Sequence, residues 1–306
     1  MVNMIIGVDH GYGMMKTAHF AFPTGITMYE HEPYSLRNTL KVNGKYYVCG
    51  SNRQSLLRDK TQNDNYFLLT LAAVAKELEY RGVNSAEIIL AVGLPLTSFG
   101  LFKQEFLKYL SRFPEDKIVA FEFENKNYSI RVTDITIYPQ GYAAIMGKIN
   151  ELRREPSIIV CDIGSWTVDV LRLDRGFPNM EFNRSLELGM IRCVSEISEL
   201  VRSNTGMSVT DAQIEDILVH GGSNLSATAN RIVIENGKKY AERIISTLLE
   251  NGLDVEAVPV IFIGGGANLI QNFIPETRFC NAKFITDLHA NAKGYEYIAR
   301  QAFPNG

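Results

Sequence analysis

Apolar residues in this chain occur in two kinds of run, which predict two kinds of secondary structure. Unbroken apolar runs, for example at 88–95, 158–161 and 258–263, are typical of strands buried in a sheet. Elsewhere apolar residues recur every three or four positions, as along residues 67–81, which indicates an amphipathic helix. Strands and helices are therefore expected to follow one another along the whole chain.

Turn and cap residues predict the remaining elements. The pair Asn43-Gly44 predicts a hairpin turn, Thr210 is expected to cap a short helix that ends near 218, and the strand at 88–95 is expected to be central. Helices are also expected at 99–113, 139–153, 189–203, 226–249 and 290–302. An interruption near Gly237 is expected in the helix at 226–249. Further strands are expected at 118–124, 127–132, 134–138 and 180–186.

Residues 158–170 combine two apolar runs with a tight turn and two aspartates. A strand runs into Asp162, a Gly164-Ser165 turn follows, and a second strand carries Asp169, which together predict a β-hairpin. Backbone N–H groups and hydroxyls in such a turn can bind a phosphate, and a carboxylate beside it can hold Mg²⁺ through water. An ordinary buried hairpin, whose glycine only supplies a positive φ, also explains the pattern.

A second copy of this pattern begins near the N-terminus. The strand at 4–9 ends in Asp9, and a turn with Gly11 and Gly13 follows it. Lys16 is placed where an ammonium group can reach back to phosphate oxygens, although a solvated lysine at a strand edge fits the position equally well. Two such units, half a chain apart, suggest two similarly built domains that face one ligand.

A third glycine-rich turn follows the strand at 258–263. Gly264, Gly265 and Gly266 would let the backbone pass close to a ligand, because no Cβ atom stands in the way.

The charged stretch at 151–156 interrupts the pattern and marks the expected domain boundary. The domains are then residues 1–155, with a small inserted subdomain at about 33–85, and residues 156–306. The last helix, 290–302, is expected to pack back toward the first domain.

Composition and charge restrict the class of protein. With 306 residues, 46% of them apolar and 21% charged, the chain is long enough for two domains with cores. No apolar run approaches a membrane span and no leader opens the chain, so a cytoplasmic protein that contacts no membrane is expected. A net charge of −3 and a pI near 6.0 argue against direct binding to nucleic acid. The widely spaced cysteines are expected to be reduced.

Three motifs, in this order, carry a resemblance to a known family. Strand-Asp9-x-Gly11-Tyr12-Gly13, strand-Asp162-Ile163-Gly164-Ser165-x-Thr167-x-Asp169 and strand-Gly264-Gly265-Gly266-Ala267 resemble the first phosphate, second phosphate and adenosine motifs of the actin, sugar-kinase and heat-shock ATPase superfamily. Segments 139–142 and 291–295 occupy the places of its two connecting helices. In the size of the chain and in the residues of the second motif, the sequence is most similar to actin-like ATPases of the ParM type.

The resemblance implies the α/β fold of the actin-like ATPases, in which two RNase H-like domains enclose a cleft for nucleotide and Mg²⁺. It implies that Asp9 and Asp162 hold the water shell of Mg²⁺, and that Gln140 orients the attacking water. Around the nucleotide it places Gly11, Tyr12, Gly13, Lys16, Gly164, Ser165, Trp166, Thr167, Asp169, Gly189, Gly264, Gly265, Gly266 and Asn268. Catalysis would rest on electrostatic stabilisation and one oriented water, without a covalent intermediate.

On this fold the resemblance favours a polymerising ATPase. Hydrolysis of ATP, or of GTP, with Mg²⁺ would be coupled to filament assembly through head-to-tail contacts. The filament would serve to segregate plasmid or other DNA, and it would bind this DNA through a DNA-bound adaptor protein.

The same fold is also compatible with other functions. A non-polymerising regulatory protein that binds nucleotide stays open. A small-molecule kinase would need an aspartate base, and no candidate is evident beyond the Mg²⁺ aspartates. A chaperone ATPase would need a substrate-binding domain after Gly306.

Trp166 departs most from the ParM pattern, which usually has a small residue at this position. One interpretation is that the indole packs beneath the turn and does not respond to a ligand. The other is that the turn closes on the β- and γ-phosphates and changes the solvation of the indole. Because Trp166 is the only tryptophan in the chain, its emission distinguishes the two.

Overall fold

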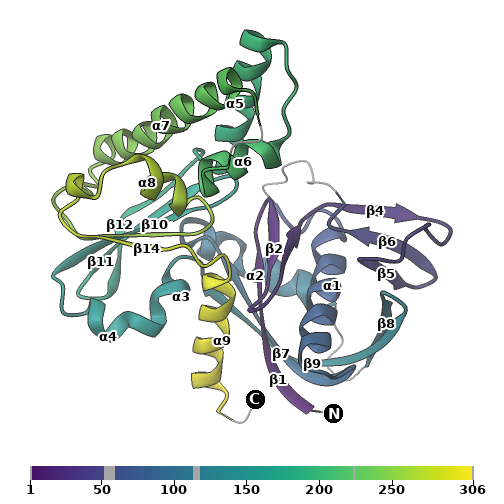
Figure 1. Ribbon diagram of the computed structural model, residues 1–306. Coiled ribbons are helices and arrows are strands. Elements are labelled where there is room, and N and C mark those ends of the chain that lie inside the picture. Colours follow the sequence, from purple (N-terminus) through teal and green to yellow (C-terminus); the bar gives the residue numbers. More distant parts are fainter. Residues whose placement is uncertain (1, 52–58, 113–117, 223–224, 305–306) are drawn as a thin grey trace. The chain divides into compact units, whose positions relative to one another are not determined.

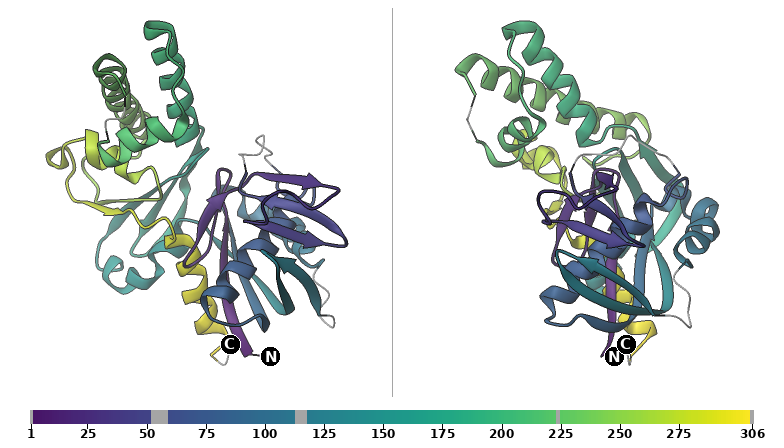
Figure 2. Two further views of the ribbon diagram at one scale, coloured as in Figure 1. Left: turned by 45° about the vertical axis from the view of Figure 1, so that its right-hand side comes forward. Right: turned by 90° about the vertical axis from the view of Figure 1, so that its right-hand side faces the viewer.

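The computed structural model describes residues 2–51, 59–112, 118–222 and 225–304 (Figures 1 and 2). The chain divides into two compact units, Met1–Gly147 with Leu288–Gly306, and Lys148–Asp287. The C-terminal segment thus completes the first unit. Each unit contains one mixed β-sheet with helices packed on it. The domain limits expected from the sequence, 1–155 and 156–306, stay predictions.

The first unit is built on a sheet that has nine strands in the described ranges, in the order β3-β2-β1-β7-β9-β8-β5-β6-β4. Its elements are β1 (Val2–His10), β2 (Met14–Lys16), β3 (Ala21–Pro23), β4 (Ile26–Tyr29), β5 (Thr39–Val42), β6 (Lys45–Cys49), α1 (Asn65–Tyr80), β7 (Ser85–Leu94), η1 (Leu96–Ser98), α2 (Phe99–Leu110), β8 (Val119–Phe123), β9 (Lys126–Pro139), α3 (Tyr142–Ile145) and α9 (Ala290–Ala302). β7 lies between β1 and β9 and is parallel to both, which confirms its expected central place.

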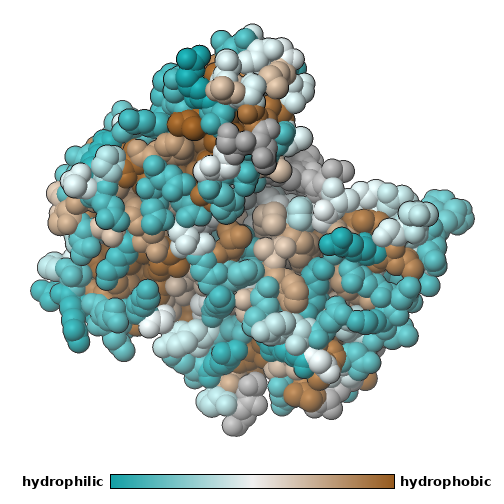
Figure 3. Space-filling view, in the orientation of Figure 1, coloured by the Kyte–Doolittle hydropathy of each residue, from teal (hydrophilic) through white to brown (hydrophobic). Residues whose placement is uncertain are grey.

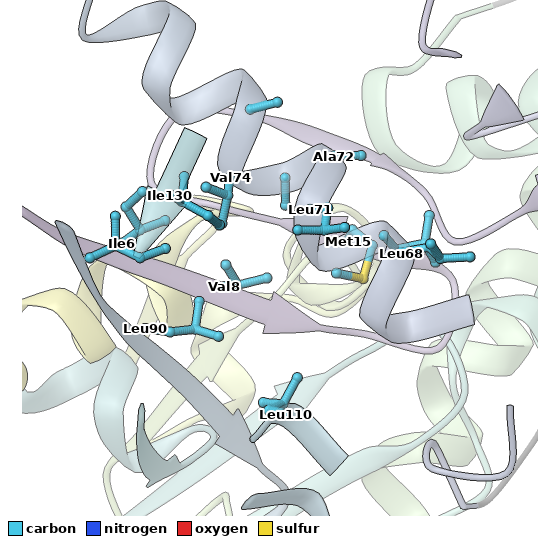
Figure 4. Packing of buried hydrophobic residues seen from close by; sticks show 14 of the residues in the cluster. Ile6, Val8, Met15, Leu68, Leu71, Ala72, Val74, Leu90, Leu110 and Ile130 are labelled. Atoms are coloured by element: carbon cyan, nitrogen blue, oxygen red, sulfur yellow. The ribbon is translucent and has the colours of Figure 1, made fainter. Parts of the chain in front are cut away.

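Alternate residues of the central strands pack on opposite faces of this sheet, as the period of two requires. Ile6 and Val8 of β1 belong to the large core on the face that α1 covers, and Figure 4 shows them near Leu71 and Val74 of that helix.

The opposite face of the same strands carries a second, smaller cluster. Ile5 of β1 and Ala91 of β7 are buried there with Tyr295 and Ala299 of α9. The C-terminal helix therefore covers the face of β1 that α1 does not.

The second unit is built on a five-stranded sheet, in the order β12-β11-β10-β13-β14 among the residues the structure describes. Its elements are α4 (Ile149–Leu152), β10 (Ser157–Ile163), β11 (Val168–Asp174), β12 (Phe177–Leu186), α5 (Met190–Thr205), α6 (Asp211–His220), α7 (Ala227–Glu250), β13 (Val260–Ile263), α8 (Ala267–Phe273), η3 (Glu276–Arg278) and β14 (Ala282–Ile285); η2 (Met146–Lys148) lies at the junction of the units.

Helices α5 to α8 pack on this sheet (Figure 1). Ile159, Cys161 and Ile163 of β10 share one buried cluster with residues of all four helices, among them Val194 and Ile245. The alternate residues of β10, including Asp162, therefore point to the other face of the sheet.

The two sheets share an order of strands. β3-β2-β1-β7-β9 of the first sheet corresponds, in sequence order and direction, to β12-β11-β10-β13-β14 of the second. In both, an antiparallel meander is followed by two strands parallel to its first strand. This confirms that the two strand-Asp-turn-strand motifs open similarly built sheets.

Several local expectations are confirmed. Asn43 and Gly44 form the turn between β5 and β6 with φ angles of 50° and 76°, the positive values that this hairpin turn needs. Thr210 caps α6 in a reciprocal capping box with Gln213. Phe113, the expected end of α2, and part of the expected insertion at 33–85 lie outside the described residues.

Three expectations are wrong in detail. α7 is not interrupted at Gly237, where an added Cβ would lie 2.3 Å from Leu218 Cδ2, so this glycine allows close packing against α6. The helix expected at 139–153 consists of α3, η2 and α4, with Gly147 in its middle, and glycine weakens a helix. The strands expected at 127–132 and 134–138 are the single strand β9, whose pairing with β7 shifts register at a bulge.

Hydrophilic residues predominate on the face drawn in Figure 3, with hydrophobic residues between them. Within the described ranges, no helix combines the length and the apolar character needed to cross a membrane.

Candidate functional site

Asp9 lies near the end of β1, on the face of the sheet that α9 covers. Its side chain is buried, and its Oδ1 accepts a hydrogen bond from Gln140 Nε2 at 2.7 Å. Its Oδ2 lies 3.4 Å from Lys16 Nζ, because β1 and β2 pair Asp9 directly with Lys16. Three residues expected at the site, Asp9, Lys16 and Gln140, are thus brought together in the first unit.

The turn at 11–13 is held by its carbonyl groups. The carbonyl of His10 accepts from the ammonium group of Lys60, and that of Gly11 accepts from Tyr66 Oη at 3.3 Å. The carbonyls of Tyr12 and Gly13 accept from Oγ1 and N of Thr24, at 2.9 and 3.1 Å. Four consecutive carbonyl groups are therefore turned toward donors of the first unit.

The direction of the carbonyls fixes the direction of the amides in this turn. The structure has no cis peptide bonds in its described residues, and in a trans peptide the C=O and the following N–H point in opposite directions. The N–H groups of Gly11, Tyr12 and Gly13 consequently point away from Lys60, Tyr66 and Thr24. An anion-binding turn requires several amides that point to one ligand, and these N–H groups are the candidates for that role.

Gln140 is fixed through its backbone as well as through its side chain. Its N–H donates to the carbonyl of Leu94 at 2.8 Å, and the N–H of the next residue, Gly141, donates to Asn291 Oδ1 at 2.9 Å. Gly141 has a φ of 72°, which glycine adopts without strain. The chain therefore turns sharply from β9 into α3 at the residue after Gln140.

In the second unit, Asp162 and Asp169 lie directly opposite each other on β10 and β11. Cross-strand neighbours project to the same face of a sheet, so the two carboxylates are side by side. Thr167 Oγ1 donates to Asp169 Oδ2 at 2.7 Å. Burial raises the pKa of the neighbouring Cys161 thiol well above its ordinary value, and the charges of both aspartates raise it further.

The turn at 164–167 repeats the arrangement of carbonyls found in the first unit. The carbonyls of Gly164, Ser165 and Trp166 accept from the N–H groups of Met190, Ile191 and Gly189, at 3.1, 2.8 and 2.9 Å. The first turn of α5 thus binds the carbonyl side of the hairpin turn. The N–H groups of residues 165–167 point away from α5 for the same geometric reason.

Gly189 lies in direct contact with the backbone of this turn. A Cβ atom there would lie 2.3 Å from the carbonyl carbon of Trp166 and 2.6 Å from that of Ser165. Tyr240 Oη donates to the Gly189 carbonyl at 3.3 Å in the buried core. Gly189 is therefore needed for the close approach of α5 to the turn.

The third motif also lies against Asp162. Gly264 has a φ of 87°, and a Cβ there would lie 2.6 Å from Asp162 Oδ1. Gly266 donates its N–H to the Ile163 carbonyl at 3.0 Å. The glycine turn is thus packed directly on the end of β10.

Two further residues expected near the nucleotide are Asn268 and Gly265. Asn268 was expected in the loop, but α8 begins at Ala267, so Asn268 is part of the first helical turn. Gly265 lies in the turn between β13 and α8.

The carboxylates suit a cation that is bound mainly through water. Within the described ranges, no group of three or more His, Cys, Asp or Glu side chains could hold a metal ion directly. Mg²⁺ keeps several waters and needs only one or two carboxylates. Asp162 with its neighbour Asp169 in one unit, and Asp9 in the other, are carboxylates of this kind, so the chemistry of each fits Mg²⁺.

Five residues around the turn at 11–13 and Gln140 were not found from the sequence. They are Thr24, Lys60, Tyr66, Asn291 and Tyr295. Only Asn291 and Tyr295 had a signal, since both lie in the segment that resembles a connecting helix. The other three reach the turn by folding of the chain and have no local pattern.

Family models match both halves of the chain. The model described as the N-terminal domain of actin-like proteins matches residues 7–142, and the model described as the C-terminal part of the archaeal actin homologue MreB-like matches residues 160–276. The two models together match most of the chain. No curated protein matches the sequence.

Solved structures show the same fold. Ta0583, an archaeal actin homolog, is 24% identical with a TM-score of 0.77, over 99% of this chain and 100% of that chain. Bacillus thuringiensis ParM with ATP is 15% identical with a TM-score of 0.68, over 98% and 99% of the two chains. The Alp12 filament structure is 15% identical with a TM-score of 0.67, over 99% and 100%. Ta0583 is also known in complex with ADP.

The fold is the α/β fold of the actin homologues, with two mixed sheets, as expected. The chain belongs to the actin-like proteins.

Proposed function

We propose that this protein binds ATP with Mg²⁺, hydrolyses it, and polymerises into filaments under the control of the nucleotide. One observation carries the proposal. The turns at 11–13 and 164–167 both have their carbonyls turned to donors of their own unit, and both direct successive N–H groups the other way. A buried hairpin with a purely structural role has no need for this arrangement in two separate turns.

Each residue then has a role suited to its chemistry. The N–H groups of the two turns bind the β- and γ-phosphates, with Lys16 as a neighbouring cation and the hydroxyls of Ser165 and Thr167 as further donors. Gly189 and Gly264–Gly266 allow the backbone to approach the nucleotide closely. Asn268 contributes from the start of α8.

Asp9, Asp162 and Gln140 carry the reaction. Asp9 and Asp162 hold the water shell of Mg²⁺, which when bound neutralises charge on the phosphates. Gln140 orients the attacking water through the amide oxygen that does not face Asp9. No residue needs to form a covalent intermediate, because phosphoryl transfer depends mainly on positioning and electrostatics.

Relatives support the choice of ligand and of assembly. ATP is named with the Bacillus thuringiensis ParM structure, ADP with Ta0583, and a filament with Alp12. We infer the same for this chain, with GTP as an alternative nucleotide. Binding energy at the phosphates would shift the population toward the form that assembles.

We further infer that the filament segregates plasmid or other DNA through an adaptor protein. The net charge of −3 offers no broad basic surface, so the adaptor and not this chain would contact DNA. A regulatory protein that binds nucleotide without polymerising is the second candidate. A small-molecule kinase is less well supported, because the described aspartates of the site already have other roles.

The experiment measures nucleotide binding by calorimetry and assembly by light scattering and pelleting, with ATP, ADP and GTP, each with and without Mg²⁺. We expect Mg²⁺-dependent binding and assembly with a triphosphate. Asp162→Ala should lower hydrolysis by about a hundredfold or more, as removal of a metal-positioning group does. Asp134→Ala, an exposed aspartate on β9, is the matched control and should hydrolyse at the wild-type rate.

Two outcomes would contradict the proposal. Absence of binding with every nucleotide would refute the site. Binding and hydrolysis by a protein that stays monomeric at tens of micromolar would refute polymerisation and favour the regulatory candidate.

A further inference from the structure

One face of α9 is built to approach β1 and β7 closely. Small residues of the two strands, Gly7, Ala91 and Gly93, lie on the face that α9 covers. A Cβ at Gly7 would lie 2.2 Å from the Ala292 carbonyl oxygen, and a Cβ at Gly93 would lie 2.0 Å from Tyr295 Oη. The absence of side chains on the strands is therefore what brings α9 within reach of the strand ends.

Tyr295 uses this space to reach Asp9. Its side chain is fully buried, its ring lies over Gly93, and its hydroxyl is 3.5 Å from Asp9 Oδ1. The same oxygen accepts the 2.7 Å hydrogen bond from Gln140 Nε2. Two donors, one from α9 and one from the turn between β9 and α3, thus converge on one carboxylate oxygen.

Asn291, one helical turn before Tyr295, fixes the other side of Gln140. Its Oδ1 accepts from the N–H of Gly141 at 2.9 Å in a buried position, where only 8% of Asn291 is exposed. Residues four apart lie on the same side of a helix. Asn291 therefore holds the backbone after Gln140, while Tyr295 shares the partner of the Gln140 side chain.

We propose that Asn291 and Tyr295 are positioning residues, which set the orientation of the Gln140 amide through Gly141 and Asp9. This inference rests on the proposed function, in which Gln140 orients the attacking water. A carboxylate oxygen accepts hydrogen bonds, so Gln140 presents Nε2 to Asp9 and its Oε1 faces elsewhere. Rotation of the amide by half a turn would turn Oε1 toward the Asp9 carboxylate and present the wrong atom to a water. The Asp9 carboxylate, which Tyr295 also contacts, opposes that rotation.

A purely structural role for these residues makes a different prediction. If Tyr295 only fills the space above Gly93, its ring suffices and the hydroxyl is dispensable. If Asn291 only packs, an aspartate of the same shape and an alanine should differ in stability alone. The hydroxyl of Tyr295 and the oxygen of Asn291 are therefore the groups to remove.

The experiment uses the full chain with Tyr295→Phe, Asn291→Ala and Asn291→Asp, and with Tyr297→Phe as the matched control. Tyr297 is on the same helix but 42% exposed. The first readout is the ¹H–¹⁵N resonances of the Gln140 side-chain amide and of the Gly141 N–H, which need no nucleotide. The second is single-turnover hydrolysis of ATP at saturation, together with the Kd for ATP.

We expect Tyr295→Phe to shift the Gln140 amide resonances and to lower the single-turnover rate about tenfold, with the Kd within about twofold of wild type. Asn291→Ala should shift the Gly141 resonance and slow the reaction similarly. Asn291→Asp, which keeps an acceptor for Gly141, should restore most of the rate. Tyr297→Phe should match wild type in every readout.

The inference is overturned if the Gln140 and Gly141 resonances stay in place in Tyr295→Phe and Asn291→Ala. It is also overturned if those resonances shift while the rate is unchanged. A wild-type protein that does not hydrolyse ATP would instead refute the proposed function, and the resonances would still show whether α9 sets the Gln140 amide.

Discussion

The side-chain amide of Gln140 donates a hydrogen bond of 2.7 Å to Oδ1 of Asp9, although 131 positions separate the two residues in the chain. Asp9 is the residue before the last of β1, and Gln140 follows β9, so β7 lies between their two strands. Folding of the sheet therefore joins one of the carboxylates expected to hold the water shell of Mg²⁺ to the residue expected to orient the attacking water.

Gln140→Ala should slow hydrolysis without preventing assembly. Orientation of a water matters in the transition state, whereas nucleotide binding in the ground state depends on the turns. We expect hydrolysis to fall by about a hundredfold, within the range for groups that act on a water. Filaments should still form with ATP and should persist longer. Phosphate release and light scattering, followed in the same sample, measure both.

The matched control is Gln104→Ala, an exposed glutamine on α2. Filaments of Gln140→Ala that turn over at the wild-type rate would assign the role to another residue.

Gly189→Ala should destabilise the second unit. The φ of Gly189 is −70°, which alanine adopts easily, so the cost is steric. The new Cβ would lie 2.3 Å from backbone atoms of Trp166, which cannot move like the end of a flexible side chain. Overpacking of this kind costs about 1–3 kcal/mol. Urea unfolding, followed by circular dichroism, measures the change.

Gly100→Ala is the control for this prediction. An added Cβ at Gly100 has no neighbour within 4 Å, and the residue lies in α2, where alanine is favoured over glycine by about 0.5–1 kcal/mol. Equal stabilities for the two variants would show that α5 does not depend on close approach to the turn.

The burial of His10 predicts that the free energy of unfolding decreases in acid. It is fully buried, and burial, followed by the charge of Lys60, lowers its pKa from 6.5 to about 3. Thr70 Oγ1 donates to the Tyr66 carbonyl and must therefore accept from His10 Nε2 at 2.8 Å, so the neutral ring carries its proton on Nε2.

The sign of the effect follows from the lowered pKa. The unfolded chain binds a proton at His10 below pH 6.5, whereas the folded chain stays neutral until about pH 3. The stabilisation is thus complete above pH 6.5 and is lost as the pH falls toward 3. Between pH 6.5 and 5 the loss is about 2 kcal/mol.

Chemical unfolding at these two pH values tests the prediction with His10→Gln, which lacks the titrating ring, and His220→Gln, an exposed histidine, as control. The wild type and His220→Gln should lose about 2 kcal/mol more than His10→Gln between the two values. An equal loss in all three would show that His10 does not titrate as a buried group.

The parts of the site that could be predicted are those whose geometry is local. The pairing of Asp162 with Asp169 follows from a hairpin with its turn at 164–167, and Asp9 meets Lys16 for the same reason. The positions of these carboxylates at strand ends follow from the apolar runs before them.

The parts that were missed depend on long-range packing. Tyr295 and Asp9 are separated by 286 positions, and their approach depends on Gly93, whose lack of a side chain has no meaning until the partner helix is known. The expected interruption at Gly237 failed for the same reason, since Leu218 fills the space that a side chain would occupy. Glycine in a sequence does not show whether it is a turn or a packing contact.

Trp166 offers a test of whether the second turn responds to phosphate. The carbonyls of this turn accept hydrogen bonds from the start of α5. A ligand that binds the N–H groups of residues 165–167 would therefore contact the opposite side of the same peptide groups. The indole is only half-buried and lies between Ser165 and Thr167, and its solvation should change with the turn. Packed beneath the turn, it would instead be insensitive to the ligand.

We expect Mg²⁺-nucleotide to change Trp166 emission at protein concentrations that keep the chain monomeric. A triphosphate analogue should give a larger change than a diphosphate, because it adds a γ-phosphate that the N–H groups of the turn can bind. Since Trp166 is the only tryptophan, the signal comes from this site alone. Identical spectra with and without saturating nucleotide, with binding shown independently by calorimetry, would mean that the turn is rigid and that nucleotide controls assembly through another element.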